Sequence, residues 1–220
     1  MGRAVLLAAL VSAIACGELT GPRDIERHQS TPTPGGTRNP STAFTVVDAD
    51  RILPHFDEPP SGFHQTDTAS GRPVLTRPYH GDETCEGAPL PERNFVGGES
   101  IAFERDRIGD PTFQFLGSNA MVFSDASSAS AALVAFTNCF RGPSWFSGQS
   151  PGDPKLGAES VIFTGSRRIR GPDWLSELNV QSVLYMWRVN NLLLNVLLEG
   201  PSVDWHDAEA VARLMDTRTR

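Results

Sequence analysis

The chain has few of the residues that enzymatic and cofactor-binding motifs need. It contains only three cysteines, none in a C-x-x-C pair, and its five histidines form no H-x-x-H or H-E-x-x-H pair. A G-x-S-x-G elbow, a P-loop and a G-x-G-x-x-G turn are also missing. These absences argue against thiol redox chemistry, zinc binding, serine hydrolysis and nucleotide binding. We therefore expect no catalytic residue, no metal site and no cofactor.

Positive charge is scarce as well. The formal net charge is −7, Lys155 is the only lysine among 220 residues, and the other basic residues apart from histidine are arginines. An acidic chain is a poor partner for nucleic acid, so we expect no such partner. The preference for arginine over lysine indicates a GC-rich genome, such as that of an actinobacterium.

The first apolar run is too short to cross a bilayer, but it has the form of an export signal. Arg3 precedes an uncharged, mostly apolar run from Ala4 to Ala15, and small residues then lead to Cys16. This order predicts a signal peptide over residues 1–15. It also resembles the lipobox of bacterial lipoproteins, which implies that Cys16 is lipidated and becomes the mature N-terminus.

Ordinary signal cleavage is an open alternative, because Ala13 stands where a lipobox usually has Leu and Ala13-Ile14-Ala15 fits the A-x-A rule. That alternative gives a secreted protein. Cysteine counting favours lipidation, which leaves Cys85 and Cys139 as an even pair. We expect a disulfide between them in the oxidising exported compartment, the alternative being two buried thiols. The expected location is the extracytoplasmic face of the cell membrane, through the lipid anchor.

The chain changes character after the signal. Residues 16–43 are rich in Pro, Gly, Ser, Thr and charge and show no apolar periodicity. Such a segment cannot bury enough surface to offset its ordering entropy, so it predicts a disordered tether. We expect one folded domain over residues 44–220.

Periodicity in the folded part predicts an α+β fold, with one antiparallel sheet and helices packed on one of its faces. We expect helices over 46–53, from a cap at Ser124 or Asp125 to Phe140, and after a cap at Asp204. Expected strands are a weak one within 62–68, then 100–105, 112–123 with an interruption at 117–119, 159–164, 180–189 and 192–198. Asn190-Asn191 predicts a two-residue hairpin turn of type I′, with a positive φ at both residues.

The hairpin register defines two faces with different composition. The first face is apolar and should form the core under the helices: Val183, Tyr185, Trp187, Val189, Leu192, Leu194, Val196 and Leu198. The second face mixes apolar and polar side chains, and six of them are candidates for a half-open ligand groove: Leu184, Met186, Arg188, Leu193, Asn195 and Leu197.

Arg188 is the expected polar anchor of that groove, because its guanidinium can hold a carboxylate or phosphate with two hydrogen bonds. In the alternative interpretation, a loop such as the Trp145 segment covers this face and Arg188 pairs internally with Glu199.

Several short stretches resemble the extracellular sensor domain of mycobacterial PknH-type serine/threonine kinases and related actinobacterial lipoproteins. They are residues 49–54 (ADRILP), Val122-Phe123 before a helix ending at Asn138-Cys139, 156–160 (LGAES), 187–191 (WRVNN) and 208–212 (AEAVA). The resemblance implies a disulfide-stapled sheet with helices and a cleft that binds a ligand. The chain departs from that pattern in having one expected disulfide instead of two and no kinase domain.

Together these features predict a cell-envelope lipoprotein with a non-enzymatic, extracytoplasmic ligand-binding or sensor-type domain. Its expected partners are the membrane, through the lipid anchor, and a small amphiphilic ligand or an envelope protein. Two other functions remain as alternatives. One is a structural or adhesive surface protein without a small ligand, and the other is an envelope hydrolase.

Overall fold

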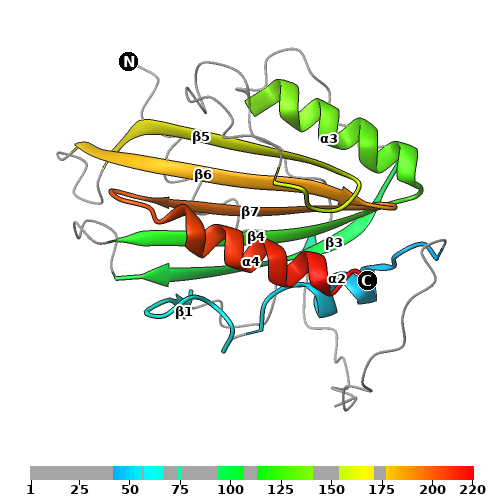
Figure 1. Cartoon of the computed structure of the whole chain (residues 1–220), viewed down its shortest axis with the longest axis horizontal. Coiled ribbons are helices and arrows are strands. Elements are labelled where there is room, and N and C mark those ends of the chain that lie inside the picture. Colours follow the sequence, from blue (N-terminus) through cyan, green and yellow to red (C-terminus); the bar gives the residue numbers. More distant parts are fainter. Residues whose placement is uncertain are drawn as a thin grey trace.

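A computed structural model describes residues 42–55, 57–66, 74–75, 94–106, 113–140, 154–170 and 177–220 (Figure 1). The predicted signal peptide with Cys16, nearly all of the tether, Cys85 and the Trp145 segment lie outside these residues. In the described part of the chain, no helix is long and apolar enough to span a membrane.

The described strands form one antiparallel sheet in the order β1-β3-β4-β7-β6-β5, with β2 also paired to β3. Their bounds are β1 (His64–Gln65), β2 (Val74–Leu75), β3 (Phe95–Arg105), β4 (Gln114–Phe123), β5 (Glu159–Arg170), β6 (Glu177–Val189) and β7 (Leu192–Gly200). The helices are α2 (Val46–Ile52), α3 (Ala126–Phe140) and α4 (Trp205–Thr217). The predicted α+β class and the antiparallel sheet are confirmed.

Several strands are longer or more regular than the sequence predicted; β3, for example, begins at Phe95 and not at Ser100. Strand β4 continues through residues 117–119, because each of them has a partner on both β3 and β7. The Asn119 side chain also donates a hydrogen bond to Asn195 Oδ1 at 2.8 Å, which ties β4 to β7. Strand β5 continues beyond Thr164 to Arg170, paired with β6 along its whole length.

The hairpin register is confirmed, but its turn differs from the prediction. Val189 pairs with Leu192 across the two-residue turn. Asn190 has a positive φ of 51°, whereas Asn191 does not have a positive φ, so the turn is not type I′. Asn191 is buried instead, accepting from Phe44 N at 2.7 Å and donating to Phe123 O at 2.8 Å. These long-range hydrogen bonds, and not the turn alone, fix its conformation.

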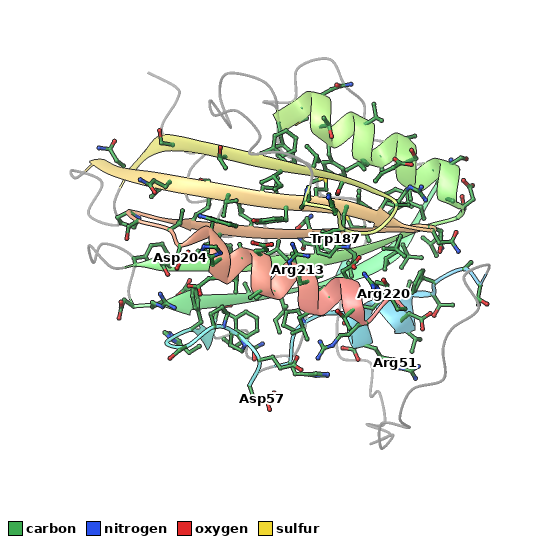
Figure 2. All side chains as sticks on the ribbon, viewed as in Figure 1. Arg51, Asp57, Trp187, Asp204, Arg213 and Arg220 are labelled. Atoms are coloured by element: carbon green, nitrogen blue, oxygen red, sulfur yellow. The ribbon has the colours of Figure 1, made fainter. Side chains whose placement is uncertain are left out.

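The first hairpin face is the core that the sequence predicted. Trp187, Tyr185, Leu194 and Val196 are buried there. Figure 2 labels Trp187 on the sheet. Helices α2 and α4 pack on this face, and α4 crosses the middle of the sheet in Figure 1. The apolar side of α4 consists of Ala208, Val211, Ala212 and Met215, at the three- and four-residue steps of a helix facing a core.

The second hairpin face is covered by α3, so the helices lie on both faces of the sheet and not on one. Asp125 caps α3 by accepting a hydrogen bond from Ser128 N at 2.8 Å. The predicted apolar stripe of α3 is buried: Ala129, Ala132, Leu133, Phe136 and Phe140. Because α2 and α4 already occupy the first face, this stripe packs on the other. Cys139 is buried in the last turn of α3, while Cys85 lies outside the described residues.

Candidate ligand-binding pocket

The six residues predicted to line a groove lie together on one hairpin face, but α3 covers them. Leu184, Met186, Leu193 and Asn195 are buried, and Leu197 is partly buried. Leu184, Met186 and Leu193 belong to the apolar cluster that includes Phe136 of α3, and Leu197 packs against it. The predicted half-open groove is therefore absent at these described residues, which α3 covers. The Trp145 loop considered from the sequence lies outside the described residues.

Arg188, the expected anchor, is held by groups of the protein itself. Its Nε and Nη2 donate to Glu159 Oε1 at 3.0 and 2.8 Å, and its Nη1 donates to Asn190 O at 3.0 Å. Burial disfavours ionisation of Glu159, but hydrogen bonds from Ser130 and Arg188 outweigh it and keep the pKa of this carboxyl below its ordinary value. Arg188 thus pairs with Glu159 and not with Glu199.

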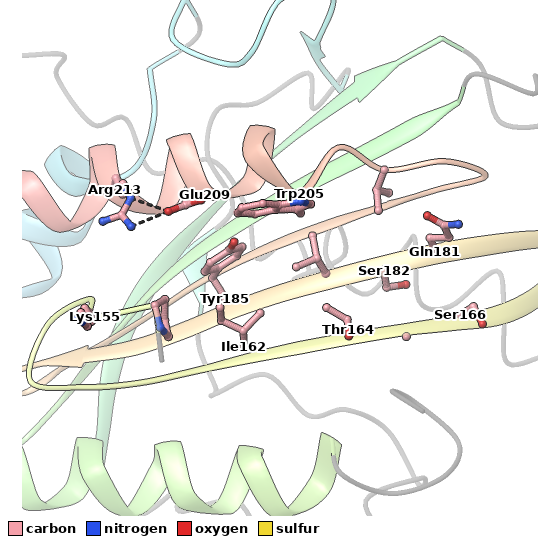
Figure 3. Close-up of a pocket in the computed structure, with 14 residues that line it drawn as sticks. Lys155, Ile162, Thr164, Ser166, Gln181, Ser182, Tyr185, Trp205, Glu209 and Arg213 are labelled. Carbon is pink, nitrogen blue, oxygen red and sulfur yellow. Dashed lines mark hydrogen bonds and ion pairs between the residues drawn. The ribbon is translucent and has the colours of Figure 1, made fainter. Parts of the chain in front are cut away.

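A pocket of about 760 Å³ opens instead on the α4 face, over β5 and β6 (Figure 3). Its lining follows the periodicities of strand and helix. Alternate residues of β5 and β6 face it, and α4 contributes residues four apart, which share one side of a helix. These residues are Ile162, Thr164 and Ser166 from β5, Gln181, Val183 and Tyr185 from β6, and Trp205, Glu209 and Arg213 from α4. Pro154, Lys155, Gly165, Ser182 and Val203 complete the lining.

The middle of the pocket is apolar. Ile162, Val183 and Tyr185 form a buried floor on the sheet, and Trp205 stands over it from the first turn of α4. The Trp205 side chain is 48% exposed, an unusual state for the largest apolar residue type. An exposed tryptophan beside a buried apolar floor supplies contact area for a bound molecule.

The two ends of the pocket are polar in different ways. Figure 3 shows charged side chains toward one end and uncharged polar side chains toward the other, with Ile162, Tyr185 and Trp205 between them. The charged end has Lys155, Glu209 and Arg213, and the uncharged end has Thr164, Ser166, Gln181 and Ser182. Arg213 Nε donates to Glu209 Oε1 at 2.8 Å.

Tyr185 brings a hydrogen-bond donor into the apolar middle. Burial and the negative charge of Glu209 together raise the pKa of its phenol to about 12, and the positive charge of Arg213 partly opposes this rise. The phenol is therefore protonated at neutral pH. Tyr185 is only 2% exposed, and its hydroxyl makes no hydrogen bond to another residue within the described ranges. It is available to a molecule in the pocket.

The chemistry of the lining residues suits binding. They combine apolar side chains with hydroxyl, amide and charged groups, the mixture found in small-molecule sites. In the ranges that the structure describes, no three His, Cys, Asp or Glu side chains are placed to share a metal ion.

The pocket was missed in the sequence because its residues come from three elements. Two local signals were present. Trp205 directly follows the helix cap Asp204, where capping needs no apolar ring. Glu209 and Arg213 form a favourable i,i+4 ion pair on the same side of the helix as Trp205. Neither signal identifies β5 and β6 as the opposite wall.

Comparisons with known proteins found similarity among solved structures alone. The chain matches no family model and no curated protein. Among solved structures, it is similar to the extracellular domain of PknH from Mycobacterium tuberculosis, at 10% identity and a TM-score of 0.47. The similarity covers 81% of this chain and 98% of that one. A likeness of this size leaves the function to be argued from the pocket itself.

Proposed function

We propose that the domain is the extracytoplasmic, non-enzymatic binding domain of a cell-envelope lipoprotein, and that its pocket binds a small amphiphilic ligand. The observation that carries the proposal is the placement of a buried apolar floor, an exposed tryptophan and the unshared Tyr185 hydroxyl around one cavity. A volume of about 760 Å³ lies in the range of small-molecule sites, roughly 300–1,000 Å³.

An amphiphile fits the pocket better than a wholly polar molecule. Its apolar part would lie over the floor of Ile162 and Val183 and against the ring of Trp205, which otherwise leaves apolar surface facing water. Its polar part would reach one of the two polar ends. A wholly polar ligand would make no favourable contact with that floor. Its polar groups there would lose bound water without gaining hydrogen bonds in return.

The anchoring half of the proposal rests on the sequence. Cys16 would carry the lipid, and the tether would join the domain near Phe44, whose backbone is held by the side chain of Asn191 at the hairpin turn. A Cys85–Cys139 disulfide would fix the end of α3. Metabolic palmitate labelling should mark the wild-type protein and not Cys16→Ser. Labelling of neither protein would point to the secreted alternative.

Ligand binding is tested by native mass spectrometry of the full exported chain, carrying Cys16→Ser and purified from its own host, then titrated with dodecanoate. We expect one bound amphiphile per chain. Trp205→Ala should remove most of the binding, because it takes away one wall of the pocket. Val134→Ala is the matched control, since Val134 is 55% exposed on α3, on the other face of the sheet.

Equal binding by Trp205→Ala, Val134→Ala and the parent chain would place the ligand elsewhere. Failure of every amphiphile tested, together with a native fold by circular dichroism, would favour the structural or adhesive alternative.

A further inference from the structure

We infer that the pocket selects anionic amphiphiles, with the head group at the end formed by Arg213 and Lys155 and the tail across Ile162 toward Trp205. This inference rests on the proposed function and adds the sign of the ligand's charge and the direction in which the ligand lies.

The charged residues that line the pocket favour an anionic head group. The chain is acidic overall, with a net charge of −7, yet the residues that line the pocket include two cations and one anion. The only lysine of the chain, Lys155, is one of them. Its backbone has a φ of 55°, a conformation that non-glycine residues seldom adopt, and its neighbours Pro154 and Leu156 are buried. The buried neighbours fix the point from which the lysine side chain extends.

Arg213 can donate further hydrogen bonds to a ligand. Its Nε and Nη2 both donate to the same oxygen, Glu209 Oε1, and its Nη1 makes no hydrogen bond to a residue in the described part of the chain. The side chain is 56% exposed, so it can adjust at little cost. A carboxylate or phosphate oxygen can therefore be bound through Nη1 while the contact with Glu209 persists.

The opposite charge preference has a weaker basis. Trp205, Tyr185 and Glu209 together resemble the surroundings that favour a ligand cation, because aromatic faces and a carboxylate attract positive charge. However, Glu209 is already paired with Arg213, and a cationic head group would have to compete with that guanidinium. The hydroxyl of Tyr185 donates to an anion but has no attraction for a quaternary ammonium through its proton.

The test compares four ligands that share a twelve-carbon tail: dodecanoate, dodecyl phosphate, dodecanol and dodecyltrimethylammonium. Each is titrated by calorimetry, below its micellar concentration, into the full exported chain carrying Cys16→Ser. Both anions should bind about tenfold or more tightly than dodecanol, with the cation weakest. Dodecanoate against dodecyl phosphate shows whether a fatty-acid or a phospholipid-like head group is preferred. Added salt should weaken only the anions.

Two substitutions give opposite expected signs, which a general change in folding would not produce. Arg213→Gln should weaken dodecanoate binding about threefold to tenfold, because a charged donor is lost. Glu209→Gln should strengthen it, because it removes a competing anion and leaves the whole guanidinium free. Arg51→Gln is the matched control, an exposed arginine on α2, which Figure 2 shows on a different helix from Arg213. Lys155→Gln serves if Arg213→Gln does not fold.

Each outcome separates this inference from the proposed function. Equal affinity for all four ligands, with loss of binding in Trp205→Ala, overturns the charge preference and leaves the pocket as a binding site. Tightest binding of the cation, weakened by Glu209→Gln, reverses the inference. Failure of all four ligands to bind a folded protein overturns the proposed function itself.

Discussion

The two faces of the sheet are covered by helices of similar length, yet only one of them carries the pocket described above. Helix α3 packs against β4, β5, β6 and β7, whereas α4 packs mainly against β6 and β7. On the α4 side, β5 is therefore left without a helix above it, and the cavity lies over β5 and β6. The comparison teaches that the set of strands a helix covers, and not the apolar content of the face alone, accounts for where this pocket opens.

The residues at the helix–sheet contacts explain the difference in closure. On the α3 side, Phe136 and Phe140 stack with ring centroids 6.0 Å apart, and Phe140 meets Phe163 of β5 edge-on at 5.9 Å. These rings reach across to the last strand. On the other side, the buried apolar face of α4 consists of Ala208, Val211, Ala212 and Met215 and includes no aromatic ring.

The largest expected effect is at the centre of the α4 face. Trp187→Ala should lower the free energy of unfolding by about 3–5 kcal/mol, because the ring is fully buried and leaves a large cavity. Trp187 Nε1 has no hydrogen-bond partner, so the loss should come from packing. Urea denaturation followed by circular dichroism measures it. A change below about 1 kcal/mol would mean that the α4 face is not the tightly packed core described here.

The α3 face should be nearly as sensitive. Leu193→Ala is expected to cost about 2–5 kcal/mol, since the side chain is fully buried in the α3 cluster. Val134→Ala, on the exposed side of the same helix, should change stability by no more than about 0.5 kcal/mol. If both variants had equal, small effects in the same denaturation assay, the second hairpin face would be open to solvent and not sealed by α3.

The difference between these faces also shows what the sequence can predict. Local rules gave the hairpin register, because a two-residue turn fixes every cross-strand pair, and they gave the apolar stripe of α3. They did not show which face each helix covers. The mixed face of Arg188 looked unexplained only because its partners, Glu159 and the α3 stripe, are distant in sequence.

The pocket was beyond local rules for the same reason. Trp205, Tyr185 and Ile162 are each ordinary in their own segments, and they form a site only because α4 returns over β6 beside β5. The prediction of a type I′ turn was wrong for a related reason. The buried hydrogen bonds of Asn191 with Phe44 and Phe123 override the local preference of the turn.

The pocket floor can be distinguished from an ordinary surface by its pH dependence. The pKa of Tyr185 is raised from 10.0 to about 12, so between these values the unfolded chain loses this proton while the folded protein keeps it. The unfolded state then binds fewer protons, and the free energy of unfolding falls as the pH rises through this window. Below the lower value the contribution is fully present.

Urea denaturation at about pH 9 and about pH 11 checks this sign, with Tyr185→Phe as the control. The parent should lose more stability than Tyr185→Phe over that interval. A parallel loss in both proteins would show that the phenol titrates as it does in water.

A smaller effect on folding is expected at the rim of the pocket. Trp205→Ala should lower the free energy of unfolding by only about 1–2 kcal/mol, because nearly half of the residue is already in water. The same change should remove most of the binding of dodecanoate. A large loss of stability would show that Trp205 belongs to the packed core and is not an accessible wall of the pocket.

The claim that ligand binds on the α4 face and not under α3 is tested most directly by side-chain NMR. A chain of residues 16–220 carrying Cys16→Ser is labelled at its Ile, Val, Leu and Met methyl groups and titrated with dodecanoate. The largest shift changes should fall on Ile162 and Val183, which line the pocket. Methyl groups of Leu184, Met186 and Leu193, under α3, should change little. Largest changes at these three residues, with Ile162 and Val183 unmoved, would contradict the account.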